Sequence, residues 1–190
     1  MKKSVFLFIL LVSSLTCSQE KFEKEYRVKP AQVPENSLNF IKGLNFEKKV
    51  KWYVEESNDG KSFEAKICFQ KHLFSIEFSE KGNLIDVEKK VSFAELDLEI
   101  QNKITHKLSG TYKKYKFKKI QIQYKGLETE VKKVFLESTR NHIATRIFYE
   151  IVLKAKKEND YDLYEVLFNE NGAIIKELKF KQINSINLEF

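Results

Sequence analysis

Apolar and polar residues alternate along several short runs of the chain, which is the pattern of half-buried β-strands. The clearest runs cover residues 49–56, 63–69, 73–79, 115–123, 149–153 and 161–168. In the first run, Val50, Trp52 and Val54 share one face and charged residues share the other. The alternation therefore predicts an antiparallel sheet with one apolar face against a core and one wetter face.

Three other stretches have the spacing of amphipathic helices. Residues 34–41 predict a short helix, and residues 127–139 predict a third one. The clearest helix is predicted between them, over Ser92–Leu108. Within this range, apolar residues recur every four positions. Ser92 and Glu95 also have the spacing of a capping box at its start.

Two segments of the chain match each other at a spacing of 90 residues. Leu73–Ile85 aligns with Leu163–Ile175 without a gap, and each predicts a strand, a turn with glycine and a second strand. The glycine suits a hairpin turn because such turns need a positive φ. A helix and further strands precede each copy in the same order. The predicted fold class is therefore α+β, a tandem repeat of a helix followed by antiparallel β-strands, with the helices packed on one face of the sheets.

The N-terminus has the three parts of a secretory signal peptide. Lys2 and Lys3 precede the apolar run 5–12, and small polar residues follow it. A helix of this run is about 12 Å long and cannot span ~30 Å of hydrocarbon, so no transmembrane helix is expected. Cleavage after Ser18 would release the chain into the periplasm or outside the cell. Lipidation of Cys17, which would tether the protein to a membrane, is the alternative.

These motifs resemble the PepSY-like family of exported bacterial proteins, which is also described as beta-lactamase-inhibitor-like. The resemblance is carried by 73–88 and 161–177, where an aromatic strand runs into a Glu/Asn-x-Gly turn, and by the helix at 92–108. It spans about residues 34–181. The resemblance implies an inhibitor-like fold and an exported, non-catalytic domain, and it supplies no catalytic residues.

The predicted organisation follows from these motifs. It comprises a signal peptide (1–18), an N-terminal tether (19–33), a first PepSY-like repeat (34–91), a second repeat (92–182) with an insertion at 124–142, and a C-terminal tail (183–190). The insertion departs from the compact repeat of the family.

Composition adds few constraints on function. The chain is 42% apolar, enough for a sizeable core, and its net charge of +7 is dispersed along the sequence. Such a charge favours solubility more than any one partner. Lysines and aromatic residues interleave over 112–119, as in proteins that bind single-stranded nucleic acid. A strand edge guarded by lysines explains the same residues, and we expect no nucleic-acid partner for an exported protein.

The sequence shows no motif for catalysis or for a bound cofactor. None of the three histidines stands in a metal-binding spacing, and no nucleotide-binding or hydrolase motif occurs. Cys68 lies within a predicted strand and is interpreted as a small apolar residue. We therefore expect no catalytic residues, no metal and no cofactor.

The wetter face of the predicted sheet is the candidate binding surface. Its residues are Lys51, Tyr53, Glu55, Glu64, Lys66 and Glu77 in the first repeat and Lys119, Gln121, Gln123, Glu150, Lys154 and Glu165 in the second. An ordinary cross-strand charge ladder would also explain such a face. The leading hypothesis is an exported, non-catalytic module that binds a protein or peptide in the periplasm or at the cell surface. The alternatives are an inhibitor of an envelope hydrolase or peptidase and an enzyme with a dispersed site.

Overall fold

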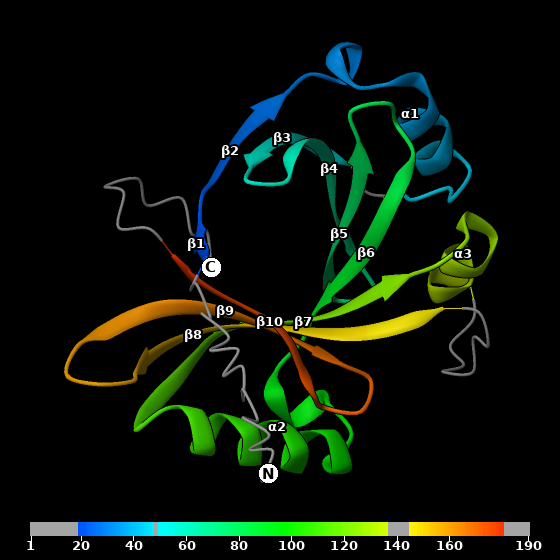
Figure 1. The fold of residues 1–190 in the computed structure, drawn as a ribbon. Helices are drawn as coiled ribbons and strands as arrows, with labels where there is room; N and C mark the ends of the chain where they lie inside the picture. The colour runs from blue at the N-terminus through cyan, green and yellow to red at the C-terminus, as the bar shows by residue number, and fades with distance from the viewer. Residues whose placement is uncertain (1–18, 48, 137–144, 181–190) are drawn as a thin grey trace, which may run out of the picture.

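The strands of this protein form one mixed sheet (Figure 1). The computed structural model describes residues 19–47, 49–136 and 145–180. The strands are β1 (Gln19–Lys21), β2 (Glu23–Val28), β3 (Lys51–Ser57), β4 (Gly60–Phe69), β5 (His72–Ser79), β6 (Leu84–Lys90), β7 (Lys114–Lys125), β8 (Arg146–Lys156), β9 (Tyr161–Asn169) and β10 (Ile174–Phe180). The helices are α1 (Glu35–Lys42), α2 (Leu98–Thr111) and α3 (Glu128–Leu136), with short 3-10 turns at Pro30–Gln32 and Phe93–Glu95. The strand order is β1-β10-β9-β8-β7-β6-β5-β4-β3-β2.

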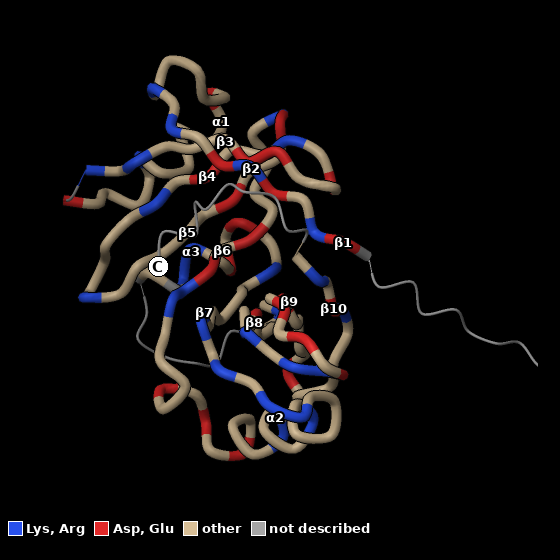
Figure 2. The backbone as a smooth tube through the Cα atoms, turned by 90° about the vertical axis from the view of Figure 1, so that its left-hand side faces the viewer, with Lys and Arg blue, Asp and Glu red and all other residues tan. Residues whose placement is uncertain are grey.

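An N-terminal strap, residues 19–28, joins the two edges of this sheet. Its first strand, β1, pairs in parallel with β10 at one edge, and β2 pairs antiparallel with β3 at the other. Only Phe22 separates the two strands, and its backbone N–H donates a hydrogen bond to Asn58 Oδ1 at 2.6 Å. Figure 2 shows the strap descending from β2, beside β3, to β1, beside β10. The sheet is therefore curled, with its polar face on the inside.

The helices α1 and α2 pack on the outer, apolar face of the strands. Phe40 of α1 contacts Phe78 of β5 with 5.5 Å between ring centroids. Ile104 of α2 is fully buried, and Tyr112, just after α2, contacts Tyr164 of β9 at 5.2 Å. The core accordingly has two clusters of buried residues, one against β3–β6 and one against β7–β10. Trp52 and Val54 are buried as the alternation predicts, whereas Val50 lies just before β3 and is only partly buried.

The predicted fold class, a tandem repeat of a helix followed by antiparallel β-strands, is wrong. Val87–Lys90 of β6 pair with Gln121–Tyr124 of β7, so all strands in the described part of the chain belong to one sheet. The strap adds a strand at each edge, and one of these pairs is parallel. Unpaired edges of β6 and β7 would leave backbone N–H and C=O groups without partners, and joining them satisfies both edges.

The predicted tether over residues 19–33 is also wrong, because most of this segment forms β1 and β2. Glu23 and Glu25 stand two residues apart on β2, so both line the inside of the sheet. The predicted signal peptide, Cys17 and the C-terminal tail at 183–190 lie outside the described residues. Their predicted roles therefore stay predictions.

The helix predicted over 127–139 is present as α3 and ties the two halves of the core together. Val131 and Phe135 of α3 are buried in the cluster that belongs to β3–β6. The Phe135 ring lies 5.0 Å from Phe74 and 5.3 Å from Phe46, measured between centroids. A segment that the sequence places as an insertion in the second half therefore completes the core of the first half.

Two of the hairpin glycines, Gly82 and Gly172, are held against helices. Gly82 has φ +82°, and a Cβ there would lie 2.8 Å from the Pro34 Cβ, just before α1. Gly172 has φ +73°, and a Cβ there would lie 2.6 Å from the Lys103 Cβ of α2. Both turns need glycine because a side chain would be strained and would push the helix outwards.

We predict that Gly172→Ala lowers the free energy of unfolding by about 1–3 kcal/mol, because it combines backbone strain with a clash against α2. The matched control is Gly110→Ala within α2, where nothing lies within 4 Å of the added Cβ. That change should stabilise the helix by up to about 1 kcal/mol. Urea unfolding followed by circular dichroism measures both. Equal stability of Gly172→Ala and wild type would contradict the packing described for this turn.

Candidate functional site

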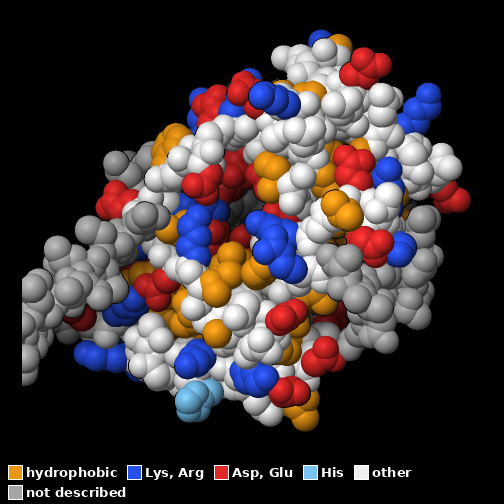
Figure 3. All heavy atoms as spheres, turned by 45° about the vertical axis from the view of Figure 1, so that its right-hand side comes forward, with side chains coloured by type: hydrophobic (Ala, Val, Ile, Leu, Met, Phe, Trp, Pro, Cys, Tyr) orange, Lys and Arg blue, Asp and Glu red, His pale blue; other side chains and the backbone are white. Residues whose placement is uncertain are grey.

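The inner face of the curled sheet encloses a cavity of about 740 Å³. It is lined by the strap and by residues of β3 to β10. Figure 3 shows the hollow, with acidic side chains on its inner wall and lysine side chains beside its opening. The volume lies within the ~300–1,000 Å³ of typical ligand sites, so this cavity is the candidate functional site.

The cavity contains all but one of the twelve residues predicted for the wetter face of the sheet. Lys154 is the exception, since it is exposed and its ammonium nitrogen lies 5.6 Å from the centroid of the Tyr161 ring. The alternation thus assigned the residues to the correct face. It did not show that the strap and the curl turn this face inwards. A binding role for these residues stays a prediction.

Twelve charged residues of the cavity were not predicted, and seven of them lie on the strap and on β6. Lys21, Glu23 and Glu25 come from the strap, whose period-two alternation is short and was interpreted as a tether. Asp86 and Glu88 come from β6, where they flank the buried Val87. This alternation was visible in the sequence and could have identified both residues.

A row of directly opposed carboxylates crosses the wall of the cavity. The strand register places Glu64 opposite Glu77 and Glu77 opposite Asp86. A second pair, Glu25 and Glu55, stands opposite each other on β2 and β3. Directly opposed side chains have Cβ atoms ~4.5–5.5 Å apart, and like charges in such positions destabilise a sheet. The arrangement therefore concentrates negative charge at a cost in stability.

Burial and mutual repulsion raise the pKa of several of these carboxyl groups. Burial is the largest cause at Glu55, and with the charges of neighbouring carboxylates it raises the pKa to about 9. At Asp86, burial and the charge of Glu77 raise the pKa to about 7. Burial and neighbouring carboxylates also raise the pKa of Glu88 well above its ordinary value. The cavity thus favours uptake of positive charge at neutral pH.

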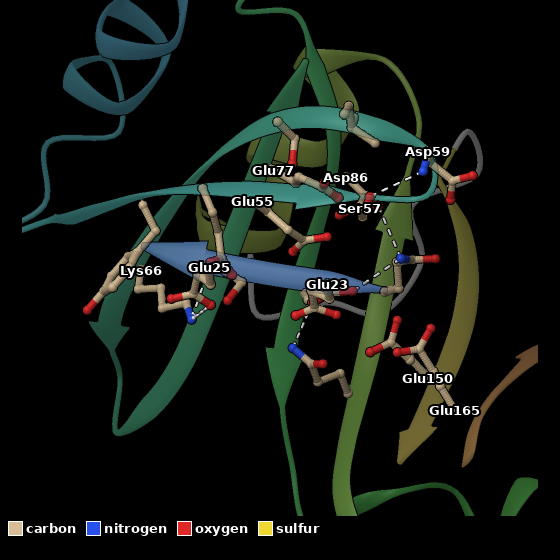
Figure 4. A pocket seen from close by; sticks show the side chains of 18 of the residues that line it. Glu23, Glu25, Glu55, Ser57, Asp59, Lys66, Glu77, Asp86, Glu150 and Glu165 are labelled. Atoms are coloured by element: carbon tan, nitrogen blue, oxygen red, sulfur yellow. Dashed lines mark hydrogen bonds and ion pairs between the residues drawn. The ribbon is translucent and has the colours of Figure 1, made fainter. Parts of the chain in front are cut away.

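Several lysines inside the cavity are held by its acidic residues, and Figure 4 shows one of these contacts, between Lys66 and Glu25. Lys21 forms an ion pair with Glu165 and lies 2.5 Å from Glu23. Burial alone would lower the pKa of Lys21, but these two carboxylates raise it well above its ordinary value. Lys66 contacts Glu25 at 2.6 Å. Figure 4 shows the carboxylates of β2, β3, β8 and β9 pointing into the same space.

Three buried acceptor atoms of the cavity have no donor among the described residues. Gln121 Nε2 donates to Glu88 Oε2 at 2.7 Å, and Gln123 Nε2 donates to Asp86 Oδ2 at 3.1 Å. These bonds leave Gln121 Oε1, Gln123 Oε1 and Asp86 Oδ1 without a partner. Each of the three residues is at most 5% exposed. A buried acceptor without a donor costs about 1–3 kcal/mol, so this wall is complementary to a molecule that supplies N–H or O–H donors.

The charged residues of the described part of the chain do not form a metal site. No group of three or more His, Cys, Asp or Glu residues there is arranged to hold a metal ion. His72 Nδ1 instead lies 3.7 Å from Glu95. In the same part of the chain, no helix is long and apolar enough to cross a membrane.

Comparisons with known proteins show the fold and no activity. No protein-family model matches the chain, and no curated protein matches its sequence. A DUF2874 family protein from Bacteroides ovatus is structurally similar, with a TM-score of 0.51, 16% identity, and coverage of 80% of this chain and 94% of that one. The present chain shares its fold.

A BLIP-like protein from Bacteroides fragilis is more distant, with a TM-score of 0.47, 13% identity, and coverage of 83% of this chain and 92% of that one. Neither structure is described as PepSY-like, so that family name stays a prediction.

We predict that the free energy of unfolding falls as the pH rises from about 4 to 7. The ordinary pKa of an aspartate is 3.8, and that of Asp86 in the folded protein is about 7. The folded state therefore binds more protons than the unfolded chain over this range, and raising the pH favours unfolding. Asp86→Asn should flatten this dependence, as measured by urea unfolding at about pH 5 and pH 7.5.

The matched control for this prediction is Glu99→Gln on α2, because the Glu99 side chain is 78% exposed to solvent. This variant should keep the pH dependence of the wild type. An Asp86→Asn protein with an unchanged pH dependence would show that Asp86 does not carry the effect.

Proposed function

We propose that this protein is an exported, non-catalytic binding module whose ligand site is the charged cavity inside its curled sheet. The observation that carries the proposal is the enclosure itself. A polar sheet face ordinarily faces water, but here the strap turns it into the lining of a cavity of about 740 Å³. The signal-like N-terminus supports a location in the periplasm or at the cell surface.

The distribution of the lining charges supports binding over catalysis. Nucleophilic catalysis needs a nucleophile, a base and an orienting group within hydrogen-bond reach of one another. The cavity instead has carboxylates and lysines spread over the strap and most strands, and many of them contact each other. Such a lining suits recognition of a ligand by many polar contacts.

The cavity also indicates how a protein partner would engage. Its volume suits a small molecule or a short chain segment and excludes a folded domain. Leu73 and Ile85 add apolar surface to the lining, and they are 54% and 38% exposed. We propose that a peptide segment of the partner enters the cavity and packs its apolar part against these two residues.

We predict that filling the cavity abolishes ligand capture. Ser75 of β5 lines the cavity between Lys66 and Glu88 in the strand register, so Ser75→Trp would occupy the space of a ligand. The matched control is Thr105→Trp on the exposed side of α2. The full chain and both variants are immobilised and exposed to envelope extract, and bound material is identified by mass spectrometry.

The wild type and Thr105→Trp should retain the same ligand at unchanged mass, while Ser75→Trp, with an unaltered circular dichroism spectrum, should lose it. Equal capture by Ser75→Trp would contradict a site in the cavity. Recovery of a chemically converted ligand would contradict a non-catalytic role.

A further inference from the structure

We infer that the cavity recognises a cationic ligand that carries several N–H donors, as an alkylammonium or guanidinium group does. The source of this chemistry is either a lysine or arginine side chain of a peptide or a free polyamine. The inference rests on the proposed binding role of the cavity and names the ligand chemistry that fits it. Three observations carry it: the balance of charge, the register of the carboxylates and the acceptors that lack donors.

The balance of charge in the cavity is opposite to that of the whole protein. Eleven carboxylates and nine lysines line the cavity, whereas the chain as a whole has a net charge of +7. Among the ion-paired side chains that line the cavity, the most buried ones are acidic. Those of Glu64, Glu165 and Asp86 are at most 12% exposed, while those of Lys66 and Lys125 are about one third exposed. The deepest part of the site is therefore rich in carboxyl groups, and each of them becomes fully charged only when a cation compensates it.

The strand register then places the carboxylates where one cation could contact two of them. Glu64, Glu77 and Asp86 occupy successive strands at directly opposed positions. Adjacent strands lie ~4.8 Å apart, so this row extends over roughly 10 Å. The two ends of the row already have a lysine nearby, since Lys66 lies 3.2 Å from Glu64 and Lys125 lies 3.4 Å from Asp86. A cation beside Glu77 would reduce the remaining repulsion and form charge-assisted hydrogen bonds with Glu77 and a neighbour. A chain with two ammonium groups separated by several methylenes could contact both ends of the row.

Glu55 provides a second point of contact for a cation. It stands opposite Glu25, and Glu25 already forms an ion pair with Lys66. No hydrogen bond or ion pair to the Glu55 carboxylate is formed by the part of the chain that the structure describes. The charge of Lys21 acts on Glu55 without a direct contact, so a bound cation would supply the contact that these residues do not.

The acceptors that lack donors meet the carboxylate row at Asp86. Its Oδ1 atom and the Oε1 atoms of Gln121 and Gln123 are buried and without partners among the described residues. An ammonium group has three N–H donors and a guanidinium group has five, and neither has an acceptor. An anionic or purely accepting ligand would leave these oxygens unsatisfied and add repulsion, so the acceptors select against it.

The test is calorimetric titration of the full chain with four probes. These are spermidine, a short peptide rich in lysine and arginine, the same peptide with acetylated lysines and with citrulline in place of arginine, and glutarate. We expect spermidine or the basic peptide to bind and the neutral peptide and glutarate to bind at least tenfold more weakly. Tighter binding of the peptide identifies a protein segment as the source, and tighter binding of spermidine identifies a free polyamine.

Variants then locate the binding. The double change Glu55→Gln and Glu77→Gln should weaken binding of the cation at least tenfold and should raise the melting temperature of the free protein, because it removes repulsion between carboxylates. Glu99→Gln on α2 should leave both quantities unchanged. The rise in melting temperature distinguishes a loss of binding from a loss of folding.

The inference is overturned if neither cation binds, if the neutral peptide binds as tightly as the basic one, or if the double variant binds as the wild type does. Its failure is distinguishable from failure of the proposed function. If the cations do not bind while Ser75→Trp still abolishes capture from envelope extract, the cavity is a binding site for a ligand of another class. If Ser75→Trp captures as the wild type does, both proposals fall together.

Discussion

Closure of the sheet by the N-terminal strap is the constraint on which the rest of the structure depends. Residues 19–28 pair with β10 at one edge and with β3 at the other, with a single residue between the two strands. A covalent link of this length requires the two edges to come close together. The sheet must therefore curl, its polar face becomes an interior wall, and its apolar face remains outside for α1 and α2 to cover.

This arrangement separates stability from recognition. The two apolar clusters on the outside of the sheet, with α3 bridging from one half to the other, supply the hydrophobic burial that holds the fold together. The inner wall works against stability, because opposed carboxylates and acceptors without donors are costly in a buried place. Ion pairs with Lys21, Lys66, Lys119 and Lys125 offset part of that cost. Because the hydrophobic clusters stabilise the fold, the inner wall can keep polar groups that lack partners. A wall with such groups is suited to binding a ligand.

The shared fold with the DUF2874 family protein places this architecture among bacterial proteins without defining what it binds. Folds of this kind carry different functions in different sites, so the identity of the ligand has to come from the chemistry of the cavity. In this chain, the charge balance inside the cavity, the strand register at Glu77 and the free acceptor of Asp86 all favour a donor-rich cation.

The sequence by itself determined which face of each strand is apolar. Trp52 and Val54 are buried, and Glu55 and Glu64 line the cavity, as the alternation predicted. This was possible because side chains of a strand point to opposite faces with a period of two, which is a local property. The helix positions were readable for the same reason, since the 3.6-residue period is also local.

Only the tertiary structure decided which strands are neighbours and where the polar face points. Pairing of β6 with β7, and of the strap with both edges, uses backbone N–H and C=O groups that nearly every residue has. No side-chain pattern encodes such a choice, so Glu23 and Glu25 resembled part of a solvated tether. The curl that follows from these pairings turned an expected open surface into the wall of a cavity.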